Sequence, residues 1–112
     1  MLIILVRRFV RPQRLKQFLA SYRDQAPIDD PAFLGETLTR LNDSADLPKD
    51  MKSLPLGAPN CLTFLNIAKW RSWEAFEKHF SSAPFGFDPE IEAAPAQQAV
   101  MTIIERSSIP VG

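Results

Sequence analysis

The stretch that decides the fold is Cys61 to Phe80, CLTFLNIAKWRSWEAFEKHF, because its hydrophobic periodicity changes partway along. From Cys61 to Trp70, apolar residues fall on both alternating faces, which is typical of a central, buried β-strand. Ser72 then occupies the position of a helix N-cap. Apolar residues recur after it at helical spacing, at Trp73, Phe76, Phe80 and Ala83. The stretch therefore predicts a strand that runs directly into an amphipathic helix over Ser72–Ala83.

One residue of the predicted strand is a poor strand former. Asn66 stands in the middle of an apolar run, and burying its amide without partners costs about 1–3 kcal/mol. The same face continues with the small Ala68 and the large Trp70, which lies roughly 13 Å beyond Asn66 at about 3.3 Å of rise per residue. An amide and an indole with a methyl group between them form one wall of a pocket suited to a flat organic molecule.

The rest of the chain supplies three more strands and one more helix. Leu2–Val10 is apolar on both faces and predicts a second central strand. Pro12 suits the first turn of a helix. The apolar stripe of that helix consists of Leu15, Phe18, Leu19 and Tyr22. Phe33–Leu41 alternates only partly, with Glu36 on the same face as its leucines, and this favours an edge strand. Gln98–Glu105 predicts the last strand.

Two segments show no regular hydrophobic periodicity. Residues 43–59 hold three prolines and predict a long loop, which is typical of a lid, a partner contact or a disordered segment. Pro84–Pro95 is also predicted to be irregular, with one helical turn near Asp88–Ala93, and residues 107–112 are predicted to be a tail. At 112 residues we expect a single domain spanning residues 1–112.

The predicted order of elements is βαββαβ, the ferredoxin-like arrangement. Right-handed crossovers place the first and third strands in the centre of a four-stranded antiparallel sheet. We therefore predict an α+β fold with both helices on one face of the sheet. The other face stays largely apolar, and a second copy of the chain is the simplest cover for it, since closed two-fold dimers are the commonest oligomers.

An apolar strand ending N-x-x-x-W, followed by a polar link and an A-F helix, resembles the antibiotic biosynthesis monooxygenase (ABM) type of domain. The residues concerned are Asn66, Trp70 and Arg71–Phe76, and Phe33–Leu38 looks like the second strand of that family. The resemblance touches most of the chain except residues 43–59 and the C-terminal tail. It implies pairing as a dimeric α+β barrel. Because family members with oxygenase activity use an Asn and a Trp at this spacing, it also implies catalytic roles for Asn66 and Trp70.

Composition narrows the classes of function. Thirteen basic and thirteen acidic residues cancel, so nucleic acid is not an expected partner. Four scattered glycines give no phosphate-binding loop, and one His and one Cys make no transition-metal cluster, so we expect no metal site. Met1–Val6 is too short to span a membrane, and Arg7 follows the apolar run, which is the wrong order for a signal peptide. We expect a cytoplasmic protein without membrane contact.

Each candidate site residue also has a structural interpretation. Asn66 either holds a ligand carbonyl or oxyanion, or bonds backbone at a bulge or a dimer contact. Trp70 either stacks on an aromatic ligand or anchors the core. Tyr22 either extends its hydroxyl into the cavity between the helices and the sheet, or packs in the core with its hydroxyl exposed to water. Phe76 stands where a hydroxyl would have been useful, so no proton acceptor is identified. His79 is an acceptor, an axial haem ligand or a boundary residue.

Three hypotheses about function remain open. The first is a cofactor-independent monooxygenase that oxidises a small electron-rich aromatic compound, such as an anthrone or hydroquinone, with dioxygen. Its catalytic residues would be Asn66 and Trp70. Its substrate-binding residues would be Ala68, Tyr22, Phe76 and His79. The second is a haem-binding or haem-degrading protein with His79 as the ligand. The third is a non-catalytic homodimer that binds a small ligand.

Overall fold

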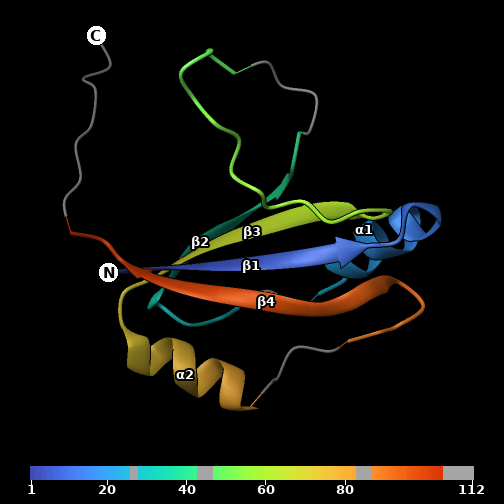
Figure 1. Cartoon of the computed structure of the whole chain (residues 1–112). Helices are drawn as coiled ribbons and strands as arrows, with labels where there is room; N and C mark the ends of the chain where they lie inside the picture. The colour runs from blue at the N-terminus through green and yellow to red at the C-terminus, as the bar shows by residue number, and fades with distance from the viewer. Residues whose placement is uncertain (26–27, 43–46, 83–86, 105–112) are drawn as a thin grey trace, which may run out of the picture.

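The described residues form four β-strands and two α-helices in the order that the periodicity predicts. The computed structural model describes residues 1–25, 28–42, 47–82 and 87–104. The elements are β1 (Leu2–Val10), the 3-10 helix η1 (Pro12–Arg14), α1 (Leu15–Arg23), β2 (Phe33–Arg40), β3 (Leu62–Trp70), α2 (Trp73–Ser82) and β4 (Glu92–Thr102). The strands form one antiparallel sheet in the order β2–β3–β1–β4, with both α-helices on the same face (Figure 1). This is the predicted α+β, ferredoxin-like fold.

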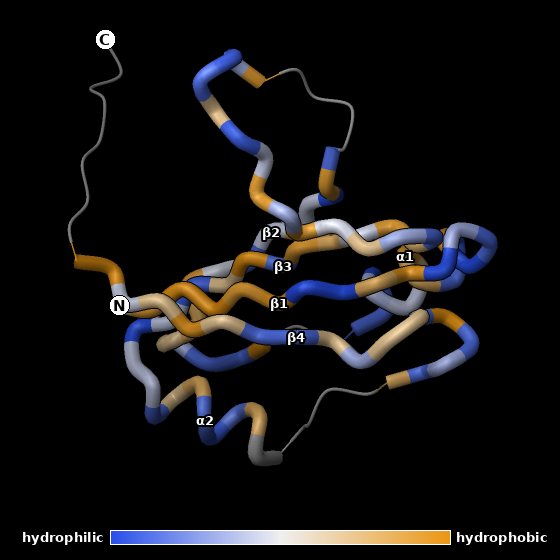
Figure 2. The backbone as a smooth tube through the Cα atoms, viewed as in Figure 1, coloured by the Kyte–Doolittle hydropathy of each residue, from blue (hydrophilic) through white to orange (hydrophobic). Residues whose placement is uncertain are grey.

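The two central strands are the two that carry apolar residues on both faces. β1 pairs with β3 without a shift in register, from Leu2 opposite Trp70 to Val10 opposite Leu62. Hydrophobic residues are concentrated along these two strands (Figure 2). The predicted helix start is also confirmed, because the backbone N–H of Ala75 donates a 3.3 Å hydrogen bond to the Ser72 hydroxyl.

The last strand begins earlier than predicted. β4 starts at Glu92, six residues before the predicted start at Gln98, because pairing with β1 overrides the weak strand propensity of its Ala, Pro and Gln residues. Pro95 is tolerated there because β4 is an edge strand with register irregularities opposite Phe9. The predicted helical turn is present but short, since the carbonyl of Asp88 accepts hydrogen bonds from the N–H groups of Ile91 and Glu92. Residues 105 and 107–112 lie outside the described residues.

The core consists of two clusters on the helix-covered face. One combines Ile4, Val6, Trp70 and Phe76, and it joins α2 to the centre of the sheet. The other combines Val10, Phe18 and Phe64, and it joins α1 to the opposite end. The helices are therefore anchored at the two ends of the sheet face. None of the described helices is both long enough and apolar enough to cross a membrane.

A β-bulge near the start of β2 changes which face its side chains occupy. Phe33 lies opposite Trp70 and Gly35 opposite Lys69, so β2 has one extra residue between them. Gly35 has a φ of 116°, which residues with a side chain rarely adopt. Because of the extra residue, Glu36 lies opposite Ala68 and faces the helices. Without the bulge, alternation would turn this carboxylate to the opposite face.

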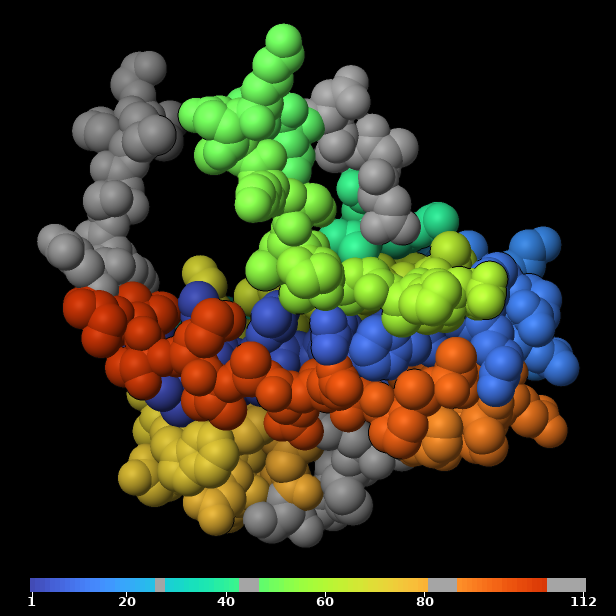
Figure 3. Space-filling view, viewed as in Figure 1, coloured from blue at the N-terminus to red at the C-terminus, as the bar shows by residue number. Residues whose placement is uncertain are grey.

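The opposite face of the sheet carries no helix. Ile3, Leu5, Leu65 and Ile67 lie there by strand alternation, and all four are partly exposed. We call this surface the open face. The described residues 47–60 of the predicted loop contain neither helix nor strand and project above the sheet on this side (Figure 3). The side chain of Arg7 joins this segment to the sheet through a 3.3 Å hydrogen bond to the Leu56 carbonyl.

Candidate functional site

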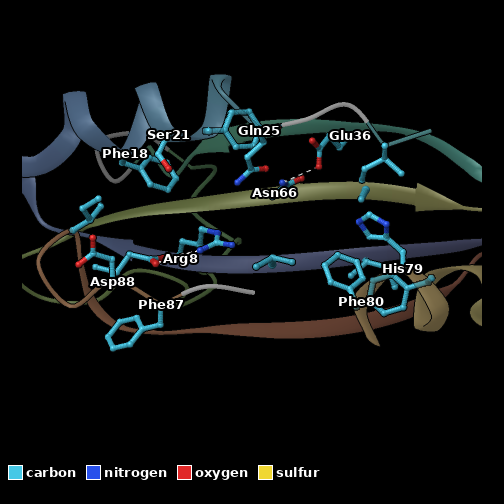
Figure 4. Close-up of a pocket in the computed structure, with 18 of the residues that line it drawn as sticks. Arg8, Phe18, Ser21, Gln25, Glu36, Asn66, His79, Phe80, Phe87 and Asp88 are labelled. Carbon is cyan, nitrogen blue, oxygen red and sulfur yellow. Dashed lines mark hydrogen bonds and ion pairs between the residues drawn. The ribbon is translucent and has the colours of Figure 1, made fainter. Parts of the chain in front are cut away.

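A cavity of about 790 Å³ lies between the helices and the sheet (Figure 4). Its floor includes Ile4 and Val6 from β1 and Asn66 and Ala68 from β3. The helices contribute Phe18, Ser21 and Tyr22 from α1 and Phe76, His79 and Phe80 from α2. The size falls within the range of about 300–1,000 Å³ that is usual for pockets that hold small organic molecules.

The structure brings five of the six predicted site residues to this cavity. They are Asn66, Ala68, Tyr22, Phe76 and His79. The sixth, Trp70, lies in the core at 1% exposure and is not among the described residues that line the cavity. Its ring packs against Phe33 and Phe76, with centroids 5.2 Å and 5.9 Å away. Trp70 therefore supports the end of the cavity from behind.

The amide of Asn66 is fixed by a carboxylate on the neighbouring strand. Its Nδ2 donates a 3.1 Å hydrogen bond to Oε2 of Glu36. The register explains the contact, because Asn66 lies opposite Leu38 and Glu36 lies two residues further along the same face. A carboxylate only accepts hydrogen bonds, so it holds the amide with its nitrogen toward Glu36. The other amide atom, Oδ1, is buried and has no partner among the described residues.

The surroundings of Asn66 fit none of the structural roles considered from the sequence. The residue lies in regular register with Val6 on one side and Leu38 on the other, so it does not sit in a bulge. It faces the helices and not the open face, where the sequence predicts a dimer contact. A buried amide oxygen without a partner costs about 1–3 kcal/mol, so Oδ1 is a position where a ligand donor or a water molecule in the cavity would bind.

The residue that sequence reasoning missed is Glu36. From the sequence alone, its place on a partly alternating strand indicates only an edge strand. In the structure it lines the cavity, is itself exposed, and accepts the hydrogen bond from Asn66. The one signal that points to Glu36 is the glycine before it, because a glycine inside a strand pattern often marks a bulge.

Tyr22 completes a polar group with Glu36 and Asn66. Burial raises the pKa of the Tyr22 hydroxyl above its usual 10.0, and the negative charge of Glu36 and a hydrogen bond to that carboxylate raise it further. The phenol therefore stays protonated at neutral pH, with its hydroxyl near the carboxylate of Glu36. Three side chains from α1, β2 and β3 thus meet at one part of the cavity. We call them the Tyr22–Glu36–Asn66 cluster.

The charged groups of the cavity are mostly carboxylates. Away from the cluster, Nη1 of Arg8 contacts both carboxylate oxygens of Glu92, at 3.0 Å and 3.3 Å. Asp88 lines the cavity beside this ion pair (Figure 4). The described residues that line the cavity include three carboxylates, those of Glu36, Asp88 and Glu92, and one guanidinium, that of Arg8. Such a site favours neutral ligands that donate hydrogen bonds over ligands that arrive as anions.

His79 lies at the other end of the cavity, among aromatic rings. Its ring centroid is 5.6 Å from that of Trp70 and 5.0 Å from that of Phe80. These contacts hold the imidazole beside Phe80 in the cavity wall (Figure 4). Within the described residues, no three His, Cys, Asp or Glu side chains gather in a group able to hold a metal ion.

No protein-family model and no curated protein matches this sequence. Among solved structures, the chain is similar to a Bacillus cereus protein provisionally assigned as an antibiotic biosynthesis monooxygenase. The TM-score is 0.60 at 11% identity, over 99% of this chain and 98% of the other. It is also similar to a mutant of SnoaB, a cofactor-independent oxygenase from Streptomyces nogalater. Here the TM-score is 0.48 at 20% identity, over 94% of this chain and 95% of the other. The first likeness confirms the ABM-type fold that the sequence resemblance implied; the second is too weak to inform fold or function.

Proposed function

We propose that the protein is a cofactor-independent monooxygenase that oxidises a small electron-rich aromatic compound, such as an anthrone, with dioxygen in the helix–sheet cavity. The observation that carries the proposal is the Asn66 amide, held by Glu36 in the wall of a cavity of about 790 Å³. This places an N–H donor beside an apolar floor, the arrangement needed to bind a flat ring and the oxygen atom on it.

The reaction draws its electrons from the substrate. An anthrone that loses a proton from its ring methylene becomes an electron-rich anion, which reduces dioxygen directly. One oxygen atom becomes the new ring carbonyl and the other leaves as water, so the products are an anthraquinone and water. The protein supplies orientation, exclusion of water and a hydrogen bond to the anion. In this proposal Asn66 makes that hydrogen bond, and Ala68 leaves room for the ring.

In this proposal, the aromatic side chains in the cavity wall position the ring of the substrate. Phe76 and Phe80 lie with centroids 4.5 Å apart and both line the cavity. Trp70 contacts Phe76 and His79 from behind, so it acts as a positioning residue for this wall. Trp70 therefore affects the bound substrate only through Phe76 and His79.

The experiment that tests the proposal is oxygen uptake by the purified protein with a panel of anthrones and hydroquinones. We expect Asn66→Ala to lower the rate at least tenfold, which corresponds to about 1.4 kcal/mol of barrier. We expect Trp70→Phe to lower it less. Thr37→Ala, on the exposed side of β2 away from the cavity, serves as the control and should leave the rate unchanged. Uptake that is indifferent to Asn66→Ala would show that the site lies elsewhere.

The position of His79 in the cavity wall supports a second candidate, haem binding. A titration with haemin separates the two. A Soret band that is lost in His79→Ala favours haem, whereas weak binding that is the same in both proteins does not. Binding of aromatic compounds without oxygen uptake would favour a non-catalytic ligand-binding protein.

We also propose that two copies pair through the open face. Ile3, Leu5, Leu65 and Ile67 form a continuous apolar strip across the two central strands there. An apolar strip of this kind is stabilised when a second copy covers it, and a two-fold axis lets the same strip serve both partners.

A further inference from the structure

We infer that Glu36 is the proton acceptor of the oxidation, an inference that rests on the proposed function. The sequence assigned no residue to this step. Deprotonation is the step that makes the ring reactive toward dioxygen, so a base within reach of the ring is required. The geometry of the Tyr22–Glu36–Asn66 cluster points to Glu36.

Glu36 combines access to the cavity with access to water. It lines the cavity from edge strand β2, and its side chain is exposed. A base in this position takes a proton from a bound ligand on one side and releases it to solvent on the other. The bulge at Gly35 is what turns the carboxylate to this face.

The amide that stabilises the anion lies next to the group that takes the proton. Nδ2 of Asn66 is 3.1 Å from Oε2 of Glu36, and this nitrogen carries a second N–H. The carbonyl oxygen of the ring would accept that N–H, while the methylene C–H on the opposite side of the central ring faces the carboxylate. Proton removal and charge stabilisation then act on the two ends of one ring.

The other titratable groups of the cavity are less suited to the step. Glu92 is held by Arg8 in an ion pair, and its side chain is only 6% exposed. Oδ1 of Asp88 accepts a 2.9 Å hydrogen bond from the N–H of Glu90, which ties it to its own turn. The imidazole of His79 packs between two aromatic rings. Tyr22, the titratable group that faces Glu36 from α1, remains protonated because its pKa is raised.

In an anthrone, the C–H bond of the ring methylene breaks, and its electron pair moves through the ring to the carbonyl oxygen, which becomes an enolate oxygen. The proton bonds to a carboxylate oxygen of Glu36 and passes from there to water. The enolate oxygen accepts a hydrogen bond from Asn66. The oxidation by dioxygen then follows as a separate step.

The test separates proton removal from oxidation. Dithranol, a dihydroxyanthrone, is mixed with the protein under nitrogen, and the coloured anthrone anion is followed by absorbance. The wild type is compared with Glu36→Gln, which keeps the shape of the side chain and its ability to accept a hydrogen bond. Glu90→Gln is the matched control, since it makes the same change at an exposed residue outside the cavity. Quenching of tryptophan fluorescence checks that each protein binds dithranol.

We expect the wild type and Glu90→Gln to form the anion rapidly at neutral pH and Glu36→Gln to form it about 10²–10⁴-fold more slowly. At a pH where dithranol ionises in solution, Glu36→Gln should bind the anion and recover the wild-type rate of oxygen uptake when air is admitted. At neutral pH its rate should be about 10²–10⁴-fold lower, the usual contribution of a general base. Recovery at high pH distinguishes a lost base from a lost structural contact.

Two results would overturn the inference: an anion that forms at the same rate in Glu36→Gln, or dithranol that binds to the wild type without forming the anion. A third result overturns only the proposed oxidation. If the anion forms faster in the wild type than in Glu36→Gln, but no oxygen is consumed on admission of air, Glu36 is the proton acceptor of a different reaction.

Discussion

Arg8 and Glu92 come from strands at opposite ends of the chain and form a largely buried ion pair, with Nη1 of Arg8 3.0 Å from Oε1 of Glu92. The exposed fractions of the two side chains are 15% and 6%. Both side chains line the cavity, and Arg8 lies away from His79 (Figure 4). The pair also joins the early part of β4 to β1, where sequence propensity alone predicts no strand.

Glu92→Ala should destabilise the protein by about 3–5 kcal/mol, because it leaves a guanidinium with little access to water and without its carboxylate. Urea unfolding followed by circular dichroism measures the change. Replacing both partners, in Arg8→Met with Glu92→Leu, should restore most of the loss. If Glu92→Ala lowers the free energy of unfolding by less than about 1 kcal/mol, water screens the ion pair as it screens a pair on the surface.

Tyr22 allows the cluster to be tested without any substrate. It is the only tyrosine in the chain, so ultraviolet difference titration follows its ionisation alone. We expect a midpoint above 10.0 in the wild type and a lower one in Glu36→Gln, still above 10.0 because burial is the largest cause of the raised pKa. Glu90→Gln should titrate like the wild type. Equal midpoints in all three proteins would mean that Tyr22 does not contact Glu36.

The same raised pKa has a consequence for stability at alkaline pH. Since the folded state holds the Tyr22 proton more tightly than the unfolded state, this contribution to stability is complete below about pH 10 and is lost as the pH rises through the folded-state pKa. Thermal unfolding from neutral to alkaline pH should therefore show a steeper loss for the wild type than for Tyr22→Phe. Parallel curves would contradict the linkage.

Gly35→Ala tests the bulge that places Glu36. A methyl group there meets no atom within 4 Å, so the destabilisation comes from the backbone, whose φ of 116° suits glycine. We expect a loss of about 1–3 kcal/mol in the free energy of unfolding. Gly57→Ala is the matched control, since φ is not positive there, and it should be neutral or slightly stabilising. Equal effects at the two positions would show that the bulge tolerates a side chain.

Leu5→Glu tests the proposed dimer. The charge falls at the centre of the open face, where burial against a second copy would leave it without a partner, so the variant should be monomeric in analytical ultracentrifugation. Gln17→Glu, on the exposed side of α1, should sediment like the wild type. A dimer that persists in Leu5→Glu would show that the copies meet elsewhere.

Much of the fold could be predicted from the sequence, because hydrophobic periodicity within a short segment indicates which of its side chains are buried. The bounds of β1 matched, and β3 began one residue after its predicted start at Cys61. Asn66 and Ala68 reached the cavity because strand alternation fixed their face. Glu36 was missed because its face depends on the bulge and its partner depends on the pairing register, and neither is a local property. Trp70 lay on the correct face, but the packing of Phe33 and Phe76 over it follows from tertiary structure alone.

The floor of the cavity is the helix-covered face of the sheet, which is turned away from the proposed partner. In a dimer built on the open face, the two cavities would be separated by the thickness of two sheets. We expect them to saturate independently, with hyperbolic dependence on substrate, and a monomeric variant to keep its activity per chain.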